Sequence, residues 1–448
     1  MAHIFSTSLE RLHWHKRVWL LAFPIILSNV TVPLVGAVDT AVMGRLDEPE
    51  YIGAVALGAS IFSLLFWVFG FLRMGTSGFV AQSYGANQPL EIHRTLIRSL
   101  FIGVVIGACL IVLQKPLLHL CLMLFNGGER LDNLTTTYYS IRIWSAPATL
   151  SMYVLLGTLI GLQRTGGVFL IQCFLNLLNV ALDIFLVTVM QWGISGVAIA
   201  SVVSEYAALI LAVYLLRSQL FTSLNKLSTN ELLDSGALLK LATHNSNIFV
   251  RTLLLVLSFF YFNSTSTSLG SGILAANAIL LQLLHICAYA LDGFAHSAET
   301  LVGSAWGQRS RDQYRHAIAA SSLQSLAIAS LMSGLFYLYG PSMVALFTTQ
   351  AAVLQLANDY LPWLVALPVI SVWCYQLDGI FIGTTHTGEM RNAMIASAIF
   401  FFLASLVLVE KFGNHGLWLA FSGFMLCRTF TLLYYLPKIS RNIGNHAN

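Results

Sequence analysis

Two carboxyl side chains stand deep inside apolar segments of the chain, at Asp39 and Asp183. An ionisable side chain costs roughly 2.5–3.5 kcal/mol or more at the centre of a bilayer. No Lys or Arg lies within one helical turn of Asp39, so a local ion pair is not available to it. Such a carboxyl either makes structural hydrogen bonds or takes up and releases a cation, and we favour the second interpretation.

Polar residues accompany Asp183 along one face of its segment. Gln172, Asn176, Asn179 and Asp183 recur at i, i+4, i+7 and i+11, which is one stripe of an α-helix. Amides often link membrane helices by hydrogen bonds, and this explanation suits Gln172 and Asn176, which lie nearer the cytoplasmic end. Hard cations prefer oxygen ligands, so Asn179 and Asp183 are candidates for a cation site shared with Asp39.

A second polar stripe lies in the eighth apolar segment, at the same kind of spacing. Its members are His285, Tyr289, Asp292, His296 and Glu299. Asp378, in the tenth segment, adds another carboxyl to this half of the chain. For Asp292 and Asp378, cation binding and structural pairing are equal alternatives, with Arg251 as a candidate partner. His285 and Tyr261 are further polar candidates in this half.

Arg142 and Glu205 carry opposite charges within apolar segments of the first half. Charged residues inside a membrane commonly pair with one another. We therefore expect Arg142 and Glu205 to pair across two helices for structural reasons.

Two prolines interrupt the segment that carries Asp39. Pro24 and Pro33 each remove a backbone hydrogen bond and can kink a helix. Asp39 lies six residues beyond Pro33, about 9 Å along the helix axis. A carboxyl whose charge changes on a helix that can bend is a conformational switch, although prolines are also common in membrane helices.

The elements that must position these residues are membrane helices. Of the 448 residues, 57% are hydrophobic and only 9% are charged, whereas soluble domains carry about 25% charged residues. The net charge of +4 forms no basic patch, which argues against a nucleic-acid partner. The six cysteines form neither a CxxC pair nor a metal-ligand spacing, so we expect neither disulfides nor structural zinc. No cofactor is expected.

Twelve segments are long and apolar enough to cross a bilayer, which takes about 20 residues. They lie near 17–44, 51–80, 95–117, 134–161, 166–190, 194–217, 240–268, 272–304, 314–338, 354–383, 390–410 and 414–437. Lys and Arg concentrate in alternate loops, and the positive-inside rule then puts both termini in the cytoplasm. We expect an all-α integral membrane protein.

The two halves of the chain repeat each other at a spacing of 222 residues. Gly161-Leu-Gln-Arg-Thr-Gly166 matches Gly383-Thr-Thr-His-Thr-Gly388, and Gly85 falls on Gly307. Each half has an even number of spans, so the repeats share one orientation and should form two pseudo-symmetric six-helix bundles around a central cleft. The expected parts are a first lobe over 1–217, a cytoplasmic linker over 218–239 and a second lobe over 240–448.

The repeats differ in chemistry. The counterpart of Asp39 is Tyr261, and the counterparts of Asn179 and Asp183 are Phe401 and Ser405. The polar stripe of the fifth segment is therefore present only in the first lobe.

Several short motifs follow one another in a fixed order along the chain. They are Pro24 with Asn29, Val38-Asp39-Thr40, Asn179-x-x-x-Asp183 and the two glycine-bounded repeats, together with Ala290-Leu-Asp-Gly293 and Gln376-Leu-Asp-Gly-Ile-Phe-Ile-Gly383. In this order they resemble the multidrug and toxic compound extrusion (MATE) transporters, and the last two resemble the DinF branch of that family. The resemblance covers essentially the whole chain. It implies alternating access and export of amphipathic, usually cationic drugs against entry of protons or sodium.

The resemblance also implies roles for single residues. Asp39 would take the coupling cation, with Asn179 and Asp183 as its partners. Ser201 falls where relatives often have a threonine of the same network, so a hydroxyl is retained. Pro24 would be the proline at which the first helix bends on protonation.

One position departs from a related branch. The NorM branch is thought to bind sodium through an acid on its seventh helix, where this chain has Tyr261, Phe262 and Asn263. We therefore expect the coupling site in the first lobe, with a proton as the coupling ion and sodium at Asp39, Asn179 and Asp183 as the alternative. The expected protein is a monomer of the bacterial inner membrane that exports small amphipathic or cationic drug-like molecules.

Two other functions are alternatives. A flippase for a lipid-linked intermediate belongs to the same superfamily, but the acids favour cationic substrates over anionic headgroups. An intramembrane serine protease would need Ser77 of Gly75-Thr-Ser-Gly78 to act with His285 or His296 as its base. Small residues at a helix crossing explain that motif better.

Overall fold

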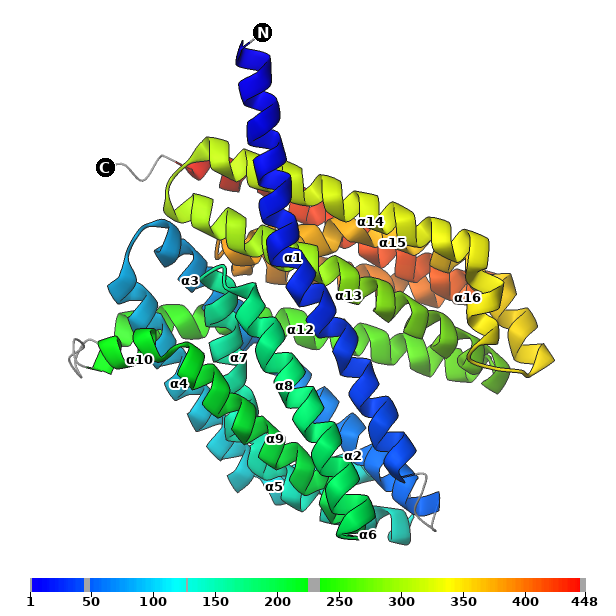
Figure 1. The fold of residues 1–448 in the computed structure, drawn as a ribbon. Coiled ribbons are helices and arrows are strands. Elements are labelled where there is room, and N and C mark those ends of the chain that lie inside the picture. The colour runs from blue at the N-terminus through cyan, green and yellow to red at the C-terminus, as the bar shows by residue number, and fades with distance from the viewer. Residues whose placement is uncertain (1, 44–48, 126–127, 225–233, 444–448) are drawn as a thin grey trace. The chain divides into compact units, whose positions relative to one another are not determined.

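The computed structural model describes residues 2–43, 49–125, 128–224 and 234–443. Every regular element within these ranges is helical (Figure 1). The helices are α1 (Ala2–Met43), α2 (Pro49–Val68), α3 (Phe71–Gly85), α4 (Pro89–Val112), α5 (Gln114–Phe125), α6 (Glu129–Arg142), α7 (Ala146–Gly161), α8 (Thr165–Asp183), α9 (Gly193–Leu215), α10 (Arg217–Leu224), α12 (Ser235–Leu269), α13 (Ser271–Gly307), α14 (Arg311–Ala345), α15 (Ala351–Gly383) and α16 (Thr387–Asn442). Two short turns join them, a 3-10 turn at Ile143–Ser145 and a π-helical stretch at Ile184–Val189.

The membrane spans agree with the sequence prediction. Within the described ranges, 10 helical stretches are long and apolar enough to cross a membrane. One of them is α16, which Gly413 divides into two helices because its φ of 56° and ψ of −132° are not helical. α1, with 42 residues, supplies the first predicted span. The predicted all-α membrane fold is confirmed, and these stretches account for twelve spans.

The helices form two compact units. One unit contains residues 27–80 and 88–241, and the other contains 1–26, 81–87 and 242–448. Residues 13–26 thus belong with the second half of the sequence, although they are part of the first predicted lobe. The predicted lobe boundaries, which came from the sequence repeat, stay a prediction.

One helix crossing is built alike in both units. In the unit with residues 27–80, a Cβ at Gly157 would collide with the carbonyl oxygen of Arg73, and one at Gly161 would lie 2.8 Å from that of Ser77. These contacts join α3 and α7. The missing side chains allow the two backbones to approach closely, as in other membrane helix pairs with small residues four apart.

The other unit repeats this crossing between α13 and α15. A Cβ at Gly379 would collide with the carbonyl oxygen of Ala295, and one at Gly383 with that of Glu299. Each of these four residues lies 222 positions after its counterpart in the α3–α7 crossing. The spacing found in the sequence therefore also relates equivalent atomic contacts.

Candidate cation-coupling site and substrate cavity

The predicted polar stripe of α8 lies on a buried face of that helix. Asn176, Asn179 and Asp183 are 8%, 6% and 0% exposed. Apolar residues beside them on the same helix point the other way, with Phe174 38% and Leu177 70% exposed. The helix therefore turns its polar face into the protein and its apolar face outward, as a membrane helix around an internal polar site must.

Two side chains of the stripe reach neighbouring helices. Asn179 Nδ2 donates to Ser201 Oγ on α9 over 3.4 Å, so the structure brings together two of the predicted cation-site residues. Asn176 Nδ2 donates to Thr31 Oγ1 on α1 over 2.6 Å. Asp183 is the last residue of α8 and is fully buried immediately before the π-helical stretch. Such wide turns are frequent at functional sites.

The predictions for the first helix are placed only in part. Asp39 and Pro33 lie within α1, but their side chains are outside the described residues. Gly36, about one turn before Asp39, lines the cavity beside the α8 stripe. Pro24 lies within α1 and is half-buried. The predicted pairing of Asp39 with Asp183 therefore stays a prediction.

A cavity of about 490 Å³ opens beside these residues, wholly within the unit of residues 27–80 and 88–241. Its polar lining includes Gln172, Asn176, Asn179, Ser201 and Ser204. Its aromatic lining includes Phe62, Phe66, Trp67, Tyr138 and Tyr153. The volume falls in the range of about 300–1,000 Å³ that small-molecule sites occupy, and a mostly apolar wall with a few polar groups is usual for them.

The cavity wall also holds the predicted ion pair. Arg142 Nη2 donates to Glu205 Oε1, and Thr149 donates to the other carboxylate oxygen. The Arg142 guanidinium lies over the rings of Phe62 and Phe66, 5.5 and 5.8 Å from their centroids. The pairing of Arg142 with Glu205 is confirmed, and it places adjacent positive and negative groups at the cavity surface.

In the second repeat, neutral residues occupy the positions that correspond to Asp39, Asn179 and Asp183. The hydroxyls of Tyr261 and Ser405 form a hydrogen bond of 3.1 Å. The Tyr261 ring meets that of Phe401 edge-on, with centroids 5.7 Å apart. Tyr261 thus contacts both of the other counterparts, Ser405 and Phe401.

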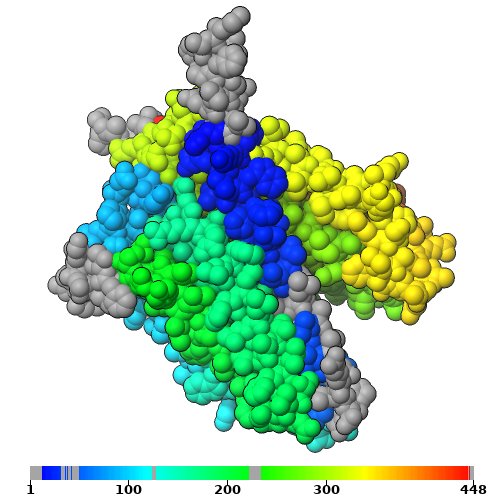
Figure 2. Space-filling view, in the orientation of Figure 1, coloured from blue at the N-terminus to red at the C-terminus, as the bar shows by residue number. Residues whose placement is uncertain are grey.

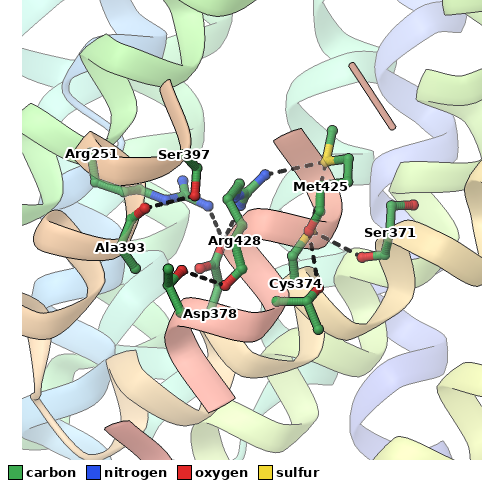
Figure 3. Close-up of polar contacts among 10 residues, drawn as sticks. Arg251, Ser371, Cys374, Asp378, Ala393, Ser397, Met425 and Arg428 are labelled. Carbon is green, nitrogen blue, oxygen red and sulfur yellow. Dashed lines mark hydrogen bonds and ion pairs between the residues drawn. The ribbon is translucent and has the colours of Figure 1, made fainter. Parts of the chain in front are cut away.

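Asp378 lies in a buried cluster of charges that joins three helices (Figure 3). Its Oδ2 accepts a hydrogen bond from Arg251 Nη2 of α12 and another, of 2.7 Å, from Arg428 Nη2 of α16. The proposed partner Arg251 is therefore confirmed for Asp378. Arg428 was not among the predicted residues, although an arginine inside the twelfth apolar segment is a signal that could have revealed it. Its Nη1 also faces Met425 Sδ at 3.6 Å.

The second polar stripe follows α13. Near its end, His296 Nδ1 lies 2.9 Å from Glu299 Oε2, with the two residues 7% and 1% exposed. Glu299 is thus buried within its unit and does not extend to the surface. Asp292 and His285 are half-buried, and the His285 ring lies 5.7 Å from that of Phe259.

Repeated helix bundles that span a membrane, with a cavity partly lined by polar residues inside one of them, are typical of secondary transporters. A family model described as MatE matches residues 24–185 and, a second time, residues 248–409. The chain belongs to this family. It is therefore a multi-pass membrane transporter and not an enzyme, which removes the protease alternative.

Individual relatives agree with this assignment. The chain is 41% identical to DNA damage-inducible protein F of Escherichia coli (strain K12) over 440 residues, covering 98% of this chain and 94% of that protein. It is 24% identical to multidrug and toxin extrusion protein 1 of Homo sapiens, covering 95% and 74%. A solved structure of a MATE protein in the bent conformation superposes with a TM-score of 0.86 at 19% identity, covering 98% of this chain and 99% of that one. The predicted MATE family and DinF branch are confirmed.

Proposed function

We propose that this protein is a cation-coupled antiporter that exports small amphipathic or cationic drug-like molecules by alternating access. It works as a monomer in the bacterial inner membrane with both termini in the cytoplasm, and it needs no cofactor. The coupling ion is a proton, and sodium is the alternative. The name of one relative, multidrug and toxin extrusion protein 1 of Homo sapiens, supports the export of drug-like molecules.

The observation that supports the proposal most is the buried α8 stripe beside the cavity. Asn179 and Ser201 already share a hydrogen bond there, and the fully buried Asp183 lies one helical turn further along. A cation bound by these oxygens would lie next to the space that can receive a drug-like molecule. Binding of the cation and binding of the drug can therefore compete for one region, as antiport requires.

The second repeat supports the place of Asp39 in this site. Tyr261 and Ser405 are in direct contact, and they correspond to positions 39 and 183. Because the α3–α7 and α13–α15 crossings obey the same spacing, we expect positions 39 and 183 to face each other in the first repeat. Two carboxylates in a poorly hydrated space repel each other, so the pair should bind a proton or a sodium ion readily.

The cycle follows from this pairing. A proton from the outer side neutralises Asp39, α1 bends at Pro24, the cavity shrinks and the drug leaves. Opening toward the cytoplasm then releases the proton. Each charge that moves down a potential of 100 mV supplies about 2.3 kcal/mol for this work.

Efflux assays in inverted membrane vesicles test the proposal. A fluorescent cationic dye is supplied, and a pH gradient and a sodium gradient are each imposed alone. We expect the pH gradient to drive dye transport. Transport driven by sodium alone would change the coupling ion, whereas transport driven by neither gradient would contradict cation coupling.

A further inference from the structure

α1 passes from one compact unit to the other between residues 26 and 27, two residues after Pro24. The part before this junction that has described side chains, residues 13–26, is named the arm here. It packs with residues 242–448, the half of the sequence that lacks the α8 stripe. The arm is seen on the molecular surface in deep blue (Figure 2).

One face of the arm is buried. Trp14, Val18, Leu21, Ala22 and Ile25 are 9%, 0%, 7%, 0% and 2% exposed. Their spacing of i, i+4, i+7, i+8 and i+11 forms a single helical stripe. The other face is open, with exposures of 41% for Trp19, 62% for Leu20 and 52% for Phe23. The arm is therefore a helix docked along one side.

The arm contacts α13 through a close backbone approach. A Cβ at Gly293 would collide with Ile26 Cγ1 and would lie 2.9 Å from the carbonyl oxygen of Ala22. One residue later, the Phe294 ring meets Trp19 edge-on, with centroids 5.2 Å apart. Glycine at 293 is what permits the arm to lie this close to α13.

The arm contacts α14 through a polar clamp. Gln324 Nε2 donates to the carbonyl oxygen of His15 over 3.0 Å and lies 2.9 Å from Nδ1 of the same histidine. Gln324 is 9% exposed, so its amide is largely shielded from solvent. Trp14 stacks on His316 of α14 with centroids 6.2 Å apart. Both contacts hold the start of the arm.

Beyond the junction, α1 is held by the other unit. Thr31 Oγ1 accepts the hydrogen bond from Asn176 of α8 and donates to the carbonyl oxygen of Ser28 over 2.7 Å. The two parts of α1 are thus fastened to different units. Pro24, which has no backbone N–H to donate, lies close to the point where they meet.

We propose that Gln324 and Gly293 are positioning residues of the transport cycle, because they keep the arm fixed to α13 and α14 while α1 bends at the end of the arm, close to Pro24. The proposal rests on the antiport cycle described above. A bend in a helix that is fastened at both ends must move the helices to which it is fastened. In this way, binding of a cation in the first repeat moves helices of the second repeat.

Removing and rebuilding the clamp tests this role. In a background whose six native cysteines are replaced by alanine, His15→Cys with Gln324→Cys removes the amide clamp. We expect the maximal rate of dye transport to fall about tenfold. The apparent KM should be unchanged, because the cavity lies in the other unit. A flexible bifunctional maleimide should restore the rate, and monofunctional N-ethylmaleimide should not.

A glycine substitution and a matched control substitution provide a second, independent test. Gly293→Leu should slow transport in the same way, because its side chain needs the space of Ile26 and Ala22. Gly334→Leu in α14 is the matched control, since a Cβ at that position meets nothing within 4 Å. Normal transport by Gly293→Leu would contradict the role of the close approach.

The yield of the maleimide bridge between positions 15 and 324 tests the anchoring of the arm independently of the proposed antiport function. We expect the same yield of the 15–324 bridge with and without dye and an imposed gradient, because the arm does not leave α14. A yield that falls when both are present, or a bridge that stops transport in place of restoring it, would overturn the proposal. Failure of the cysteine-free parent to respond to either gradient would instead count against antiport.

Discussion

The hydroxyls of Tyr261 and Ser405 share a hydrogen bond of 3.1 Å at the positions that correspond to Asp39 and Asp183 of the first repeat. We expect Tyr261→Phe to keep most of the transport rate, because ring packing against Phe401 is retained and a neutral hydrogen bond contributes only about 1 kcal/mol. Vesicle efflux and thermal unfolding in detergent measure the two effects. Complete loss of transport in folded Tyr261→Phe protein would show that this pair takes part in coupling.

The charge cluster of the second repeat should matter for stability. Asp378→Asn leaves the guanidinium groups of Arg251 and Arg428 without the carboxylate that both contact. Breaking a buried pair of this kind costs roughly 3–5 kcal/mol. We therefore predict a clear loss of thermal stability in detergent, which Arg428→Gln should partly reverse in the double variant. Asp292→Asn, at a half-buried position, should cause a smaller loss. Unaltered stability of Asp378→Asn would disprove the structural role of the cluster.

The ion pair in the cavity wall should determine how well substrates of different charge bind. Glu205→Gln leaves Arg142 without its countercharge at the cavity surface. Repulsion between the guanidinium and a cationic dye should raise the apparent KM about tenfold. A zwitterionic dye should be affected less, since its negative group can meet Arg142. Exchanging the two charges in Arg142→Glu with Glu205→Arg should recover cation transport. Equal effects on both dyes would argue against a direct electrostatic role.

His386, in the loop between α15 and α16, should make the free energy of unfolding depend on pH. Burial lowers the pKa of His386 below its ordinary value of 6.5, although Glu389 opposes this shift. The ring stands edge-on to Trp306 at 5.3 Å, and Nδ1 lies 2.9 Å from the carbonyl oxygen of Thr384.

A histidine with a depressed pKa in the folded state binds fewer protons there than in the unfolded chain. Its contribution to stability is therefore complete above pH 6.5 and is lost as the pH falls from 6.5 through the folded pKa. Thermal unfolding between pH 5 and pH 8 should show this slope, and His386→Asn should reduce it. An unchanged slope in the variant would assign the effect to another group.

Hydropathy and residue spacing were sufficient to predict the fold. Apolar runs of membrane length determine helices because backbone groups in lipid must be satisfied within the segment. The 222-residue repeat located equivalent crossings, since Gly161 and Gly383 make the same close approach in their two units. Pairing of Arg142 with Glu205 also followed from chemistry, because isolated charges in a membrane need a partner.

Other features depended on tertiary packing that spacing does not encode. Arg428 reaches Asp378 across 50 residues of sequence, and nothing local marks the pair. The docking of His15 onto Gln324, 309 residues away, is of the same kind. Apolar residues on the arm predict a buried face but do not name the helix that covers it.

We propose that Asp39 and Asp183 form the coupling site, and dye transport in inverted vesicles under an imposed pH gradient tests this most directly. Asp39→Asn keeps the shape of the side chain but cannot take up a proton. We predict that Asp39→Asn transports at the background rate, that Asp183→Asn is severely impaired, and that Asp292→Asn keeps most of its rate. Transport by Asp39→Asn at the rate of the unaltered protein would contradict the account.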